Sequence, residues 1–179
     1  MGAIFTVDWE SYFNAVIPKE HWANLELDID EPTHFLLDIL DKYNVKAIFY
    51  VLGWLRYERF DLYNEIEKRG HVMGYHGYWH ERNEKSDVAL FRSPYWDTTP
   101  MPWPPAGGFF FRIMPVWYIK WAVKRSGVMW LHPHDVMKEH PRLSNPFLNF
   151  KRQIGLKQSR LKLEKLLNEI EWENPRNYL

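Results

Sequence analysis

The chain has 179 residues, which suits one domain with a sizeable hydrophobic core, and we predict a single domain over residues 1–179. Lys plus Arg and Asp plus Glu number 23 each. The resulting zero net charge excludes a positive field over the whole molecule that would attract nucleic acid. The chain also has no polybasic run of the kind that binds a membrane surface. Cysteine is absent, which excludes disulfides and thiolate chemistry. Residues 1–8 lack the features of a secretory signal, and no stretch approaches a membrane span, so we expect a soluble, cytoplasmic protein.

The first half of the chain alternates between strand and helix patterns. Residues 3–7 form a short β-branched and aromatic run, which predicts a buried strand. Residues 32–44 have one apolar helical face, and residues 45–53 are nearly continuously apolar, as in a parallel sheet covered on both faces. A second helix is expected at 61–68 and a third strand at 71–74. This order predicts a βαβαβ series around a parallel sheet.

The second half contains fewer regular patterns. Residues 88–91 predict a short strand, and the many prolines and glycines of residues 97–108 predict a loop. Residues 114–124 have a helical pattern, and residues 128–131 predict a late strand. Residues 157–172 alternate leucines with charges and predict an amphipathic C-terminal helix.

Two histidines follow the third predicted strand. Because His76 and His80 are four positions apart, their imidazoles could grip one metal ion from neighbouring positions of a helical turn. A catalytic metal also needs a ligand such as a carboxylate, and Asp8 follows the first strand, at the same rim of the predicted sheet. The alternatives are a surface or core histidine pair and an Asp8 that caps a turn.

Aromatic residues make up 17% of the chain. Three large side chains, Trp96, Met101 and Trp103, lie in or beside the proline-rich loop. Flat aromatic faces stack on sugar rings, so this loop is a candidate sugar platform at the rim of a site. It could equally be a plug that covers an exposed edge of the core.

Four motifs together resemble one family. They are Phe5-Thr6-Val7-Asp8 with Glu10, residues 74–80, residues 91–95 and residues 130–133. In this order they are similar to the motifs of polysaccharide deacetylases with the NodB-homology domain, carbohydrate esterase family 4. Several stretches between the motifs also resemble the branch of that family often associated with surface-polysaccharide synthesis. The resemblance covers nearly the whole chain.

This resemblance implies an α/β fold, a distorted (β/α) barrel with a C-terminal helix. Only eleven residues separate His80 from Arg92, where relatives usually place a helix and more. We therefore expect a trimmed barrel, whose exposed strand edges a second subunit could complete in a homo-oligomer.

The resemblance also implies catalytic roles. It makes Asp8 the general base, Arg92 its ion-pair partner, His132 the general acid and the backbone N–H of Tyr95 the donor to the oxyanion. Asp97 is one candidate to orient His132. His134 follows His132 and is expected at the rim of the site, although a supporting role behind His132 is the alternative.

Metal and substrate contacts follow from the same comparison. His76 and His80 are the implied metal ligands, with Glu10 or Asp8 as the carboxylate, because Ser11 stands where relatives are often acidic. Zinc is expected, although cobalt, nickel and manganese suit the same donors. The expected substrate contacts are Trp96, Trp103 and Leu131.

The resulting hypothesis is a metal-dependent N-deacetylase. Its substrate would be an acetamido sugar in a precursor of a surface polysaccharide or lipopolysaccharide. One alternative is a catalytically degenerate domain that binds a glycan or a protein partner. Another is an amidohydrolase that uses the same residues on a small non-sugar amide.

Overall fold

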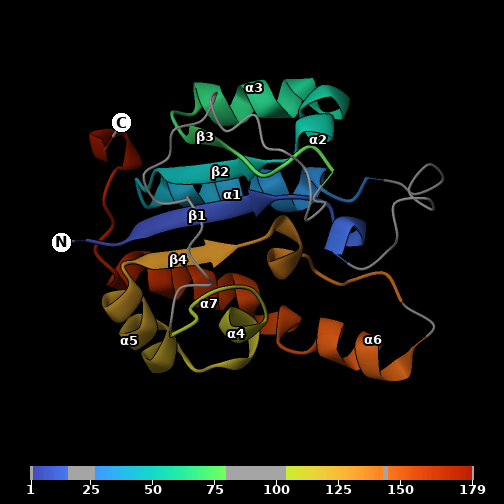
Figure 1. Cartoon of the computed structure of the whole chain (residues 1–179). Coiled ribbons are helices and arrows are strands. Elements are labelled where there is room, and N and C mark those ends of the chain that lie inside the picture. Colours follow the sequence, from blue (N-terminus) through green and yellow to red (C-terminus); the bar gives the residue numbers. More distant parts are fainter. Residues whose placement is uncertain (1, 16–26, 80–103, 143–144, 179) are drawn as a thin grey trace.

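A four-stranded parallel sheet forms the centre of the molecule (Figure 1). The computed structural model describes residues 2–15, 27–79, 104–142 and 145–178. Within them the strand order is β3-β2-β1-β4. The strands are, in chain order, β1 (Ile4–Trp9), β2 (Ala47–Val51), β3 (Val72–Tyr75) and β4 (Val128–Leu131). The predicted parallel sheet is therefore confirmed, with the last strand of the chain beside the first.

Helices and 3-10 turns connect the strands. The helices are α1 (Asp30–Lys42), α2 (Gly53–Glu58), α3 (Phe60–Lys68), α4 (Gly108–Ile113), α5 (Val116–Ser126), α6 (Pro146–Gln153) and α7 (Leu156–Glu169). The 3-10 turns are η1 (Tyr12–Ala15), η4 (Pro133–Val136) and η5 (Pro175–Tyr178). Among the described residues, no helix combines the length and apolar character needed to cross a bilayer.

The two faces of the sheet are packed differently. Alternate residues of a strand point to opposite faces, so Phe5 and Phe49 share one face while Ile4 and Ile48 share the other. The first pair belongs to the main core, which also contains side chains of α1, α3, α5 and α7. The second pair forms a small cluster with Tyr50 and Val72, to which no helix of the described part contributes. Apolar burial on the first face is the main force holding the helices to the sheet.

Helices gathered on one face of a parallel sheet are the arrangement found on the outside of a (β/α) barrel. The described strands nevertheless form an open sheet with β3 and β4 at its edges, so barrel closure is not confirmed. The strand expected at 88–91 lies outside the described residues. The C-terminal helix is confirmed, at Leu156–Glu169.

Three helices do not follow from the sequence patterns. Helix α4 begins at Gly108, at the end of the segment expected to be a loop. The Lys162 ammonium group donates to the carbonyl oxygens of Phe111, Arg112 and Met114 at 2.8–2.9 Å, and thereby satisfies the free C-terminal end of this short helix. Helix α6 spans eight residues and α2 only six, so each is too short to repeat an apolar period over several turns.

Candidate active site

The register of the sheet brings three predicted site residues to one edge. Asp8 pairs with Tyr50 of β2, and Val7 pairs with Leu131, so His132 follows beside Asp8. On the other side, Val51 pairs with Tyr75, and the next residue, His76, donates its backbone N–H to the Val51 carbonyl at 2.9 Å. Asp8, His76 and His132 therefore meet at the carboxyl ends of neighbouring parallel strands, where α/β proteins build their sites.

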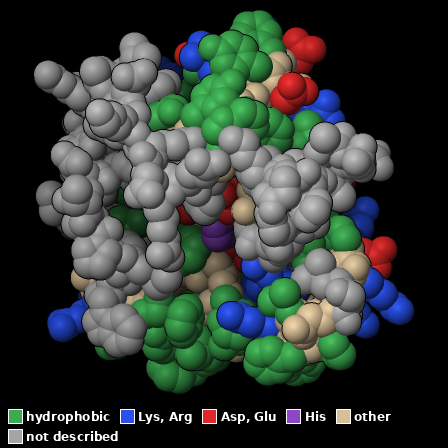
Figure 2. All heavy atoms as spheres, turned by 45° about the vertical axis from the view of Figure 1, so that its right-hand side comes forward, with side chains coloured by type: hydrophobic (Ala, Val, Ile, Leu, Met, Phe, Trp, Pro, Cys, Tyr) green, Lys and Arg blue, Asp and Glu red, His purple; other side chains and the backbone are tan. Residues whose placement is uncertain are grey.

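His132 faces two carboxylates. Its Nε2 lies 3.4 Å from Glu10 Oε1 and 3.9 Å from Asp8 Oδ2. The Glu10 side chain is 1% exposed and the Asp8 side chain 14%. Figure 2 shows a histidine side chain in a hollow of the surface, with acidic side chains beside it. A reactant could therefore reach Asp8 more easily than Glu10.

A third carboxylate, Asp135, holds His132 from behind. Its Oδ2 lies 3.0 Å from Nδ1 of His132 and accepts the backbone N–H of His132, also at 3.0 Å. The turn η4 makes this double contact possible. Pro133 starts a 3-10 turn, and this turn brings the side chain of Asp135 back to His132, the residue that caps it. The other oxygen, Oδ1, lies 3.1 Å from Nε of Arg112, and both side chains are nearly fully buried.

These contacts determine the charge of His132. Burial alone would lower its pKa, but the hydrogen bond and charge of Asp135, and then the charges of Glu10 and Asp8, raise the pKa to about 9. Burial likewise tends to raise the pKa of Asp135, but the hydrogen bond from His132 and the nearby His134, His132 and Arg112 hold it well below its usual range. At neutral pH the pair is an imidazolium held by a carboxylate, with the Nε2 proton facing the sheet edge.

His134 is not at the rim, where the sequence placed it. Its side chain is buried, and its ring stacks on that of His132 with centroids 4.4 Å apart and planes 10° apart. Burial, and then the charge of His132, hold its pKa well below the usual value. The His134 carbonyl lies 2.6 Å from Nε2 of His140, and the ring of Tyr12 packs on His140. The supporting position behind His132 is therefore the correct one of the two alternatives.

The other expected site residues have mixed outcomes. His76 is partly buried, and burial is the main cause of its lowered pKa, which the charge of Asp8 opposes. Gly74, two positions before His76, leaves room for the side chain of Tyr50, because a Cβ at Gly74 would come 2.5 Å from the Tyr50 ring. Leu131 is fully buried in the main core and exposes no surface to a ligand. The remaining predicted residues lie outside the described part, namely His80, Arg92, Tyr95, Trp96, Asp97 and Trp103.

Ser11 also has a carboxylate neighbour. Its hydroxyl donates to Oδ1 of Asp28, which accepts the backbone N–H of Tyr12 at 3.1 Å as well. Burial raises the pKa of Asp28, and these hydrogen bonds oppose the rise. The Asp28 carboxylate therefore lies beside Ser11, the position that is often acidic in relatives, although Asp28 comes from a different segment of the sequence.

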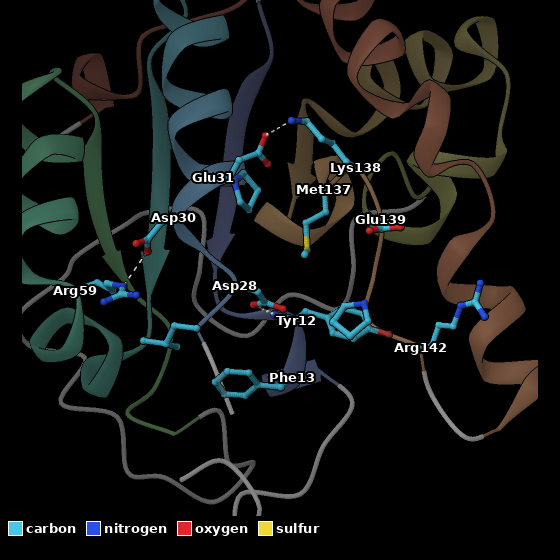
Figure 3. Close-up of a pocket in the computed structure, with 13 residues that line it drawn as sticks. Tyr12, Phe13, Asp28, Asp30, Glu31, Arg59, Met137, Lys138, Glu139 and Arg142 are labelled. Carbon is cyan, nitrogen blue, oxygen red and sulfur yellow. Dashed lines mark hydrogen bonds and ion pairs between the residues drawn. The ribbon is translucent and has the colours of Figure 1, made fainter. Parts of the chain in front are cut away.

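A large open cavity lies beside this group. It has a volume of about 830 Å³ and is lined by residues that include Tyr12, Asp28, Glu31, Arg59 and Lys138 (Figure 3). Glu31 and Arg59 are paired with Lys138 and Asp30, respectively. Asp8, Glu10 and His132 do not line this cavity, so it is separate from the edge of the sheet where they meet.

Two sets of side chains could hold a metal. His132, His134 and Asp135 offer ligand atoms within 4.8 Å of one another. The Asp135 carboxylate is already shared by Arg112 and His132, so a cation there would compete with two positive groups. Asp8, Glu10 and His76 offer the oxygen and nitrogen donors that zinc accepts, and the first two lie together before Nε2 of His132 at the edge of the sheet.

Sequence reasoning missed two residues of this site. Asp135 is not among the residues that the sequence motifs single out, although an acidic residue three positions after His132, with Pro133 between them, is a recognisable capping pattern. Arg112 carries no local signal, because it is brought to Asp135 by helix α4.

The fold and the site together define an α/β protein with a histidine and carboxylate centre at the carboxyl edge of a parallel sheet. Comparison with known families gives two matches. The polysaccharide deacetylase model matches residues 28–96, and a domain of unknown function, DUF3473, matches residues 79–179, more than half of the chain. The chain belongs to the polysaccharide deacetylase family. Nothing matched among curated proteins or among solved structures.

Family membership confirms the resemblance and indicates carbohydrate deacetylation as the general activity. Deacetylases of this family generally depend on a metal, and the donors described above fit that requirement.

Proposed function

We propose that the chain removes the N-acetyl group from an acetamido sugar by metal-dependent hydrolysis. The observation that carries this proposal is the position of His132. Asp135 holds its imidazolium from behind, and Nε2 faces Asp8 and Glu10 at the edge of the sheet. Hydrolysis of an amide needs a proton acceptor for the attacking water and a proton donor for the leaving amine.

Asp8 is the proposed base and His132 the proposed acid. The partly exposed Asp8 carboxylate accepts a proton from water as the water oxygen attacks the acetamide carbonyl carbon. When the C–N bond breaks, Nε2 of His132 gives its proton to the amine nitrogen. Nδ1 keeps its proton throughout, because the ionised Asp135 carboxylate holds it.

His76, His80 and Glu10 would hold the metal, with Asp8 as the alternative carboxylate. A divalent metal held there, with zinc as the expected ion, would polarise the carbonyl and lower the pKa of bound water. Arg92 would pair with Asp8, and the backbone N–H of Tyr95 would donate to the oxyanion. Trp96 and Trp103 are the proposed sugar contacts.

The finer proposals follow the family branch that the sequence resembles. The substrate would be a precursor of a surface polysaccharide or lipopolysaccharide, and the reaction would take place in the cytoplasm. A homo-oligomer would cover the sheet edges at β3 and β4.

A binding domain without turnover remains the second candidate, favoured by Ser11. Its hydroxyl is bonded to Asp28 and does not replace the acid of relatives as a charged ligand. In this case the chain would bind a glycan or a protein partner through the same edge of the sheet.

Acetate release separates the two candidates. The purified chain, loaded with zinc and analysed for metal, is incubated with N-acetylated sugars of different length. We expect acetate from the wild type and from His34→Ala, a control at an exposed histidine, and a loss of about 10²- to 10⁴-fold in His132→Ala. Acetate release unchanged by His132→Ala or by His76→Ala would remove the proposed mechanism. Bound zinc without acetate from any substrate would favour the binding domain.

A further inference from the structure

Charge is unevenly distributed along a chain whose net charge is zero. Residues 98–163 carry eleven Lys and Arg against two Asp and Glu, whereas the rest carries twelve against twenty-one. No acidic residue occurs in α4, α5 or α6. These helices therefore form a basic region that overall composition conceals.

The same helices expose aromatic side chains. Trp117 is 70% exposed and Trp121 50% exposed on α5, and Phe147 and Phe150 are 77% and 64% exposed on α6. Spacings of four and three positions place each pair on one helix face. Isolated exposed aromatics are ordinary. Here four of them lie on two basic helices that flank α4 on one side of the molecule (Figure 1).

Cations lie among these aromatics. Lys124 and Arg125 are exposed in the last turns of α5, and Lys151 lies beside Phe150 on α6. No ion pair with an acidic group is present for these three side chains in the described part. Lys120 differs, since it is paired with Glu169 at 2.9 Å. We define the basic-aromatic surface as Trp117, Trp121, Lys124, Phe147, Phe150 and Lys151.

Helix α4 lies between the two halves of this surface: it contacts α6 and leads directly into α5, which begins at Val116. Arg112 of α4 donates to the carbonyl oxygen of Arg152 at the end of α6, and the Lys151 ammonium lies 5.4 Å from the ring centroid of Phe109. Figure 1 places α5, α4 and α6 along the lower side of the molecule. On that side Figure 2 shows hydrophobic side chains interleaved with Lys and Arg.

We propose that the basic-aromatic surface docks the protein on an anionic lipid bilayer. Helices with apolar and aromatic residues among Lys and Arg settle in the interface of a membrane, where aromatic rings enter the headgroup region and cations meet anionic lipids. The apolar groups of this surface project from helix faces, and the large cavity lined by Tyr12 and Asp28 does not lie among them. A deformable lipid surface therefore fits it better than a peptide bound in a groove. The absence of acidic residues from α4, α5 and α6 provides the charge complementarity.

Vesicle co-sedimentation of the full chain tests this proposal. Vesicles of pure phosphatidylcholine are compared with vesicles of phosphatidylcholine and phosphatidylglycerol in roughly equal parts, at low and high salt. We expect binding to the anionic vesicles at low salt and release at high salt, because each cation near an anionic surface changes the partition coefficient about five-fold. Absence of binding at low salt would overturn the proposal.

Paired variants assign the binding to this surface. Lys124→Glu with Lys151→Glu, and separately Trp117→Ser with Trp121→Ser, are each expected to weaken partitioning at least about tenfold. The controls are Lys68→Glu and Tyr57→Ser with Phe60→Ser, at exposed positions on α2 and α3. Equal losses in the control variants would overturn the assignment.

Two further measurements complete the test. Circular dichroism and the thermal midpoint must match those of the wild type, as expected for substitutions at exposed positions. Sedimentation velocity without lipid tests whether the surface joins two copies of the chain. A dimer that Trp117→Ser with Trp121→Ser abolishes, without vesicle binding by the wild type, would replace the membrane with a second copy.

Discussion

Asp135 accepts both the ring Nδ1–H and the backbone N–H of His132 through one carboxylate oxygen, at 3.0 Å each. These two contacts fix the orientation of the ring and favour its charged form. Its other nitrogen, Nε2, faces Asp8 and Glu10. Residues behind a reacting imidazole commonly set its tautomer and basicity. In this chain the residue that does so is three positions along the same turn.

Replacement of Asp135 should change the titration of His132 before any catalysis is measured. In the metal-free wild type the pKa of His132 is raised to about 9 by Asp135 and then by Glu10 and Asp8. In Asp135→Asn we expect a lower midpoint in the histidine NMR titration, together with acetate release reduced about 10- to 100-fold. Asp61→Asn, an exposed position on α3, serves as the control. An unchanged midpoint in Asp135→Asn would contradict the positioning role.

We expect Arg112 to contribute mainly to the free energy of unfolding and less to the binding of metal or substrate. Its guanidinium lies 3.1 Å from buried Asp135, so Arg112→Met would leave a buried carboxylate with one cationic partner fewer. Loss of one member of a buried pair costs about 3 kcal/mol or more in the free energy of unfolding, which urea denaturation measures. Arg125→Met, at an exposed position, should change it by less than about 0.5 kcal/mol. Arg112→Met with wild-type stability would show that Asp135 does not need this cation.

The sheet was predictable because its strands have strong local patterns. Residues 3–7 and 45–53 are apolar runs, and β1 and β2 lie within one or two residues of these limits. The register then follows from burial, since a one-residue slip would turn Asp8 into the core and Val7 out of it. The sequence therefore indicated that Asp8 and His76 share one edge of the sheet. The pairing of β4 with β1, which brings His132 beside Asp8, is a finding of the structure.

The support behind His132 was harder to foresee. Arg112 and Asp135 are far apart in the sequence, and the contact depends on α4, a short helix whose end is satisfied by Lys162 of α7. No local period encodes such an arrangement. The buried position of His134 could not be foreseen for a similar reason. The 3-10 turn that stacks its ring on His132 depends on Pro133 and on the cap made by Asp135.

A buried histidine away from the site should make the protein sensitive to acid. His71 is 1% exposed, and its Nδ1 accepts the backbone N–H of Ala47 at 3.2 Å. Burial, and then the charge of Lys46, lower its pKa to about 4. Below pH 6.5 the His71 imidazole is protonated in the unfolded chain but stays neutral in the folded chain. The free energy of unfolding therefore falls as the pH drops from 6.5 towards 4. The loss attributable to His71 is about 3 kcal/mol.

The measurement is the free energy of unfolding in urea across this pH range. His71→Asn keeps an acceptor for Ala47 and should show a shallower decline than the wild type. His34→Asn replaces a histidine whose side chain is 51% exposed and should follow the wild-type curve. Parallel curves for the wild type and His71→Asn would show that His71 does not cause the acid sensitivity.

The two carboxylates at the sheet edge should have separable roles. Glu10 is almost completely buried, whereas Asp8 is partly exposed, and each faces Nε2 of His132. A buried carboxylate suits a fixed metal ligand, and an accessible one suits proton transfer with water. We expect Glu10→Gln to lower bound zinc at equilibrium. We expect Asp8→Asn to keep zinc but lose acetate release by about 10²- to 10⁴-fold.

Exposed Glu58→Gln is the control for both measurements. Chelation should abolish acetate release from the wild type, and added zinc should restore it. If Asp8→Asn loses zinc while Glu10→Gln keeps it, Asp8 is the metal ligand, and the proton acceptor must be sought elsewhere at the edge of the sheet. Glu10 would then be the first candidate for that acceptor, since its Oε1 is the carboxylate oxygen closer to the proposed acid.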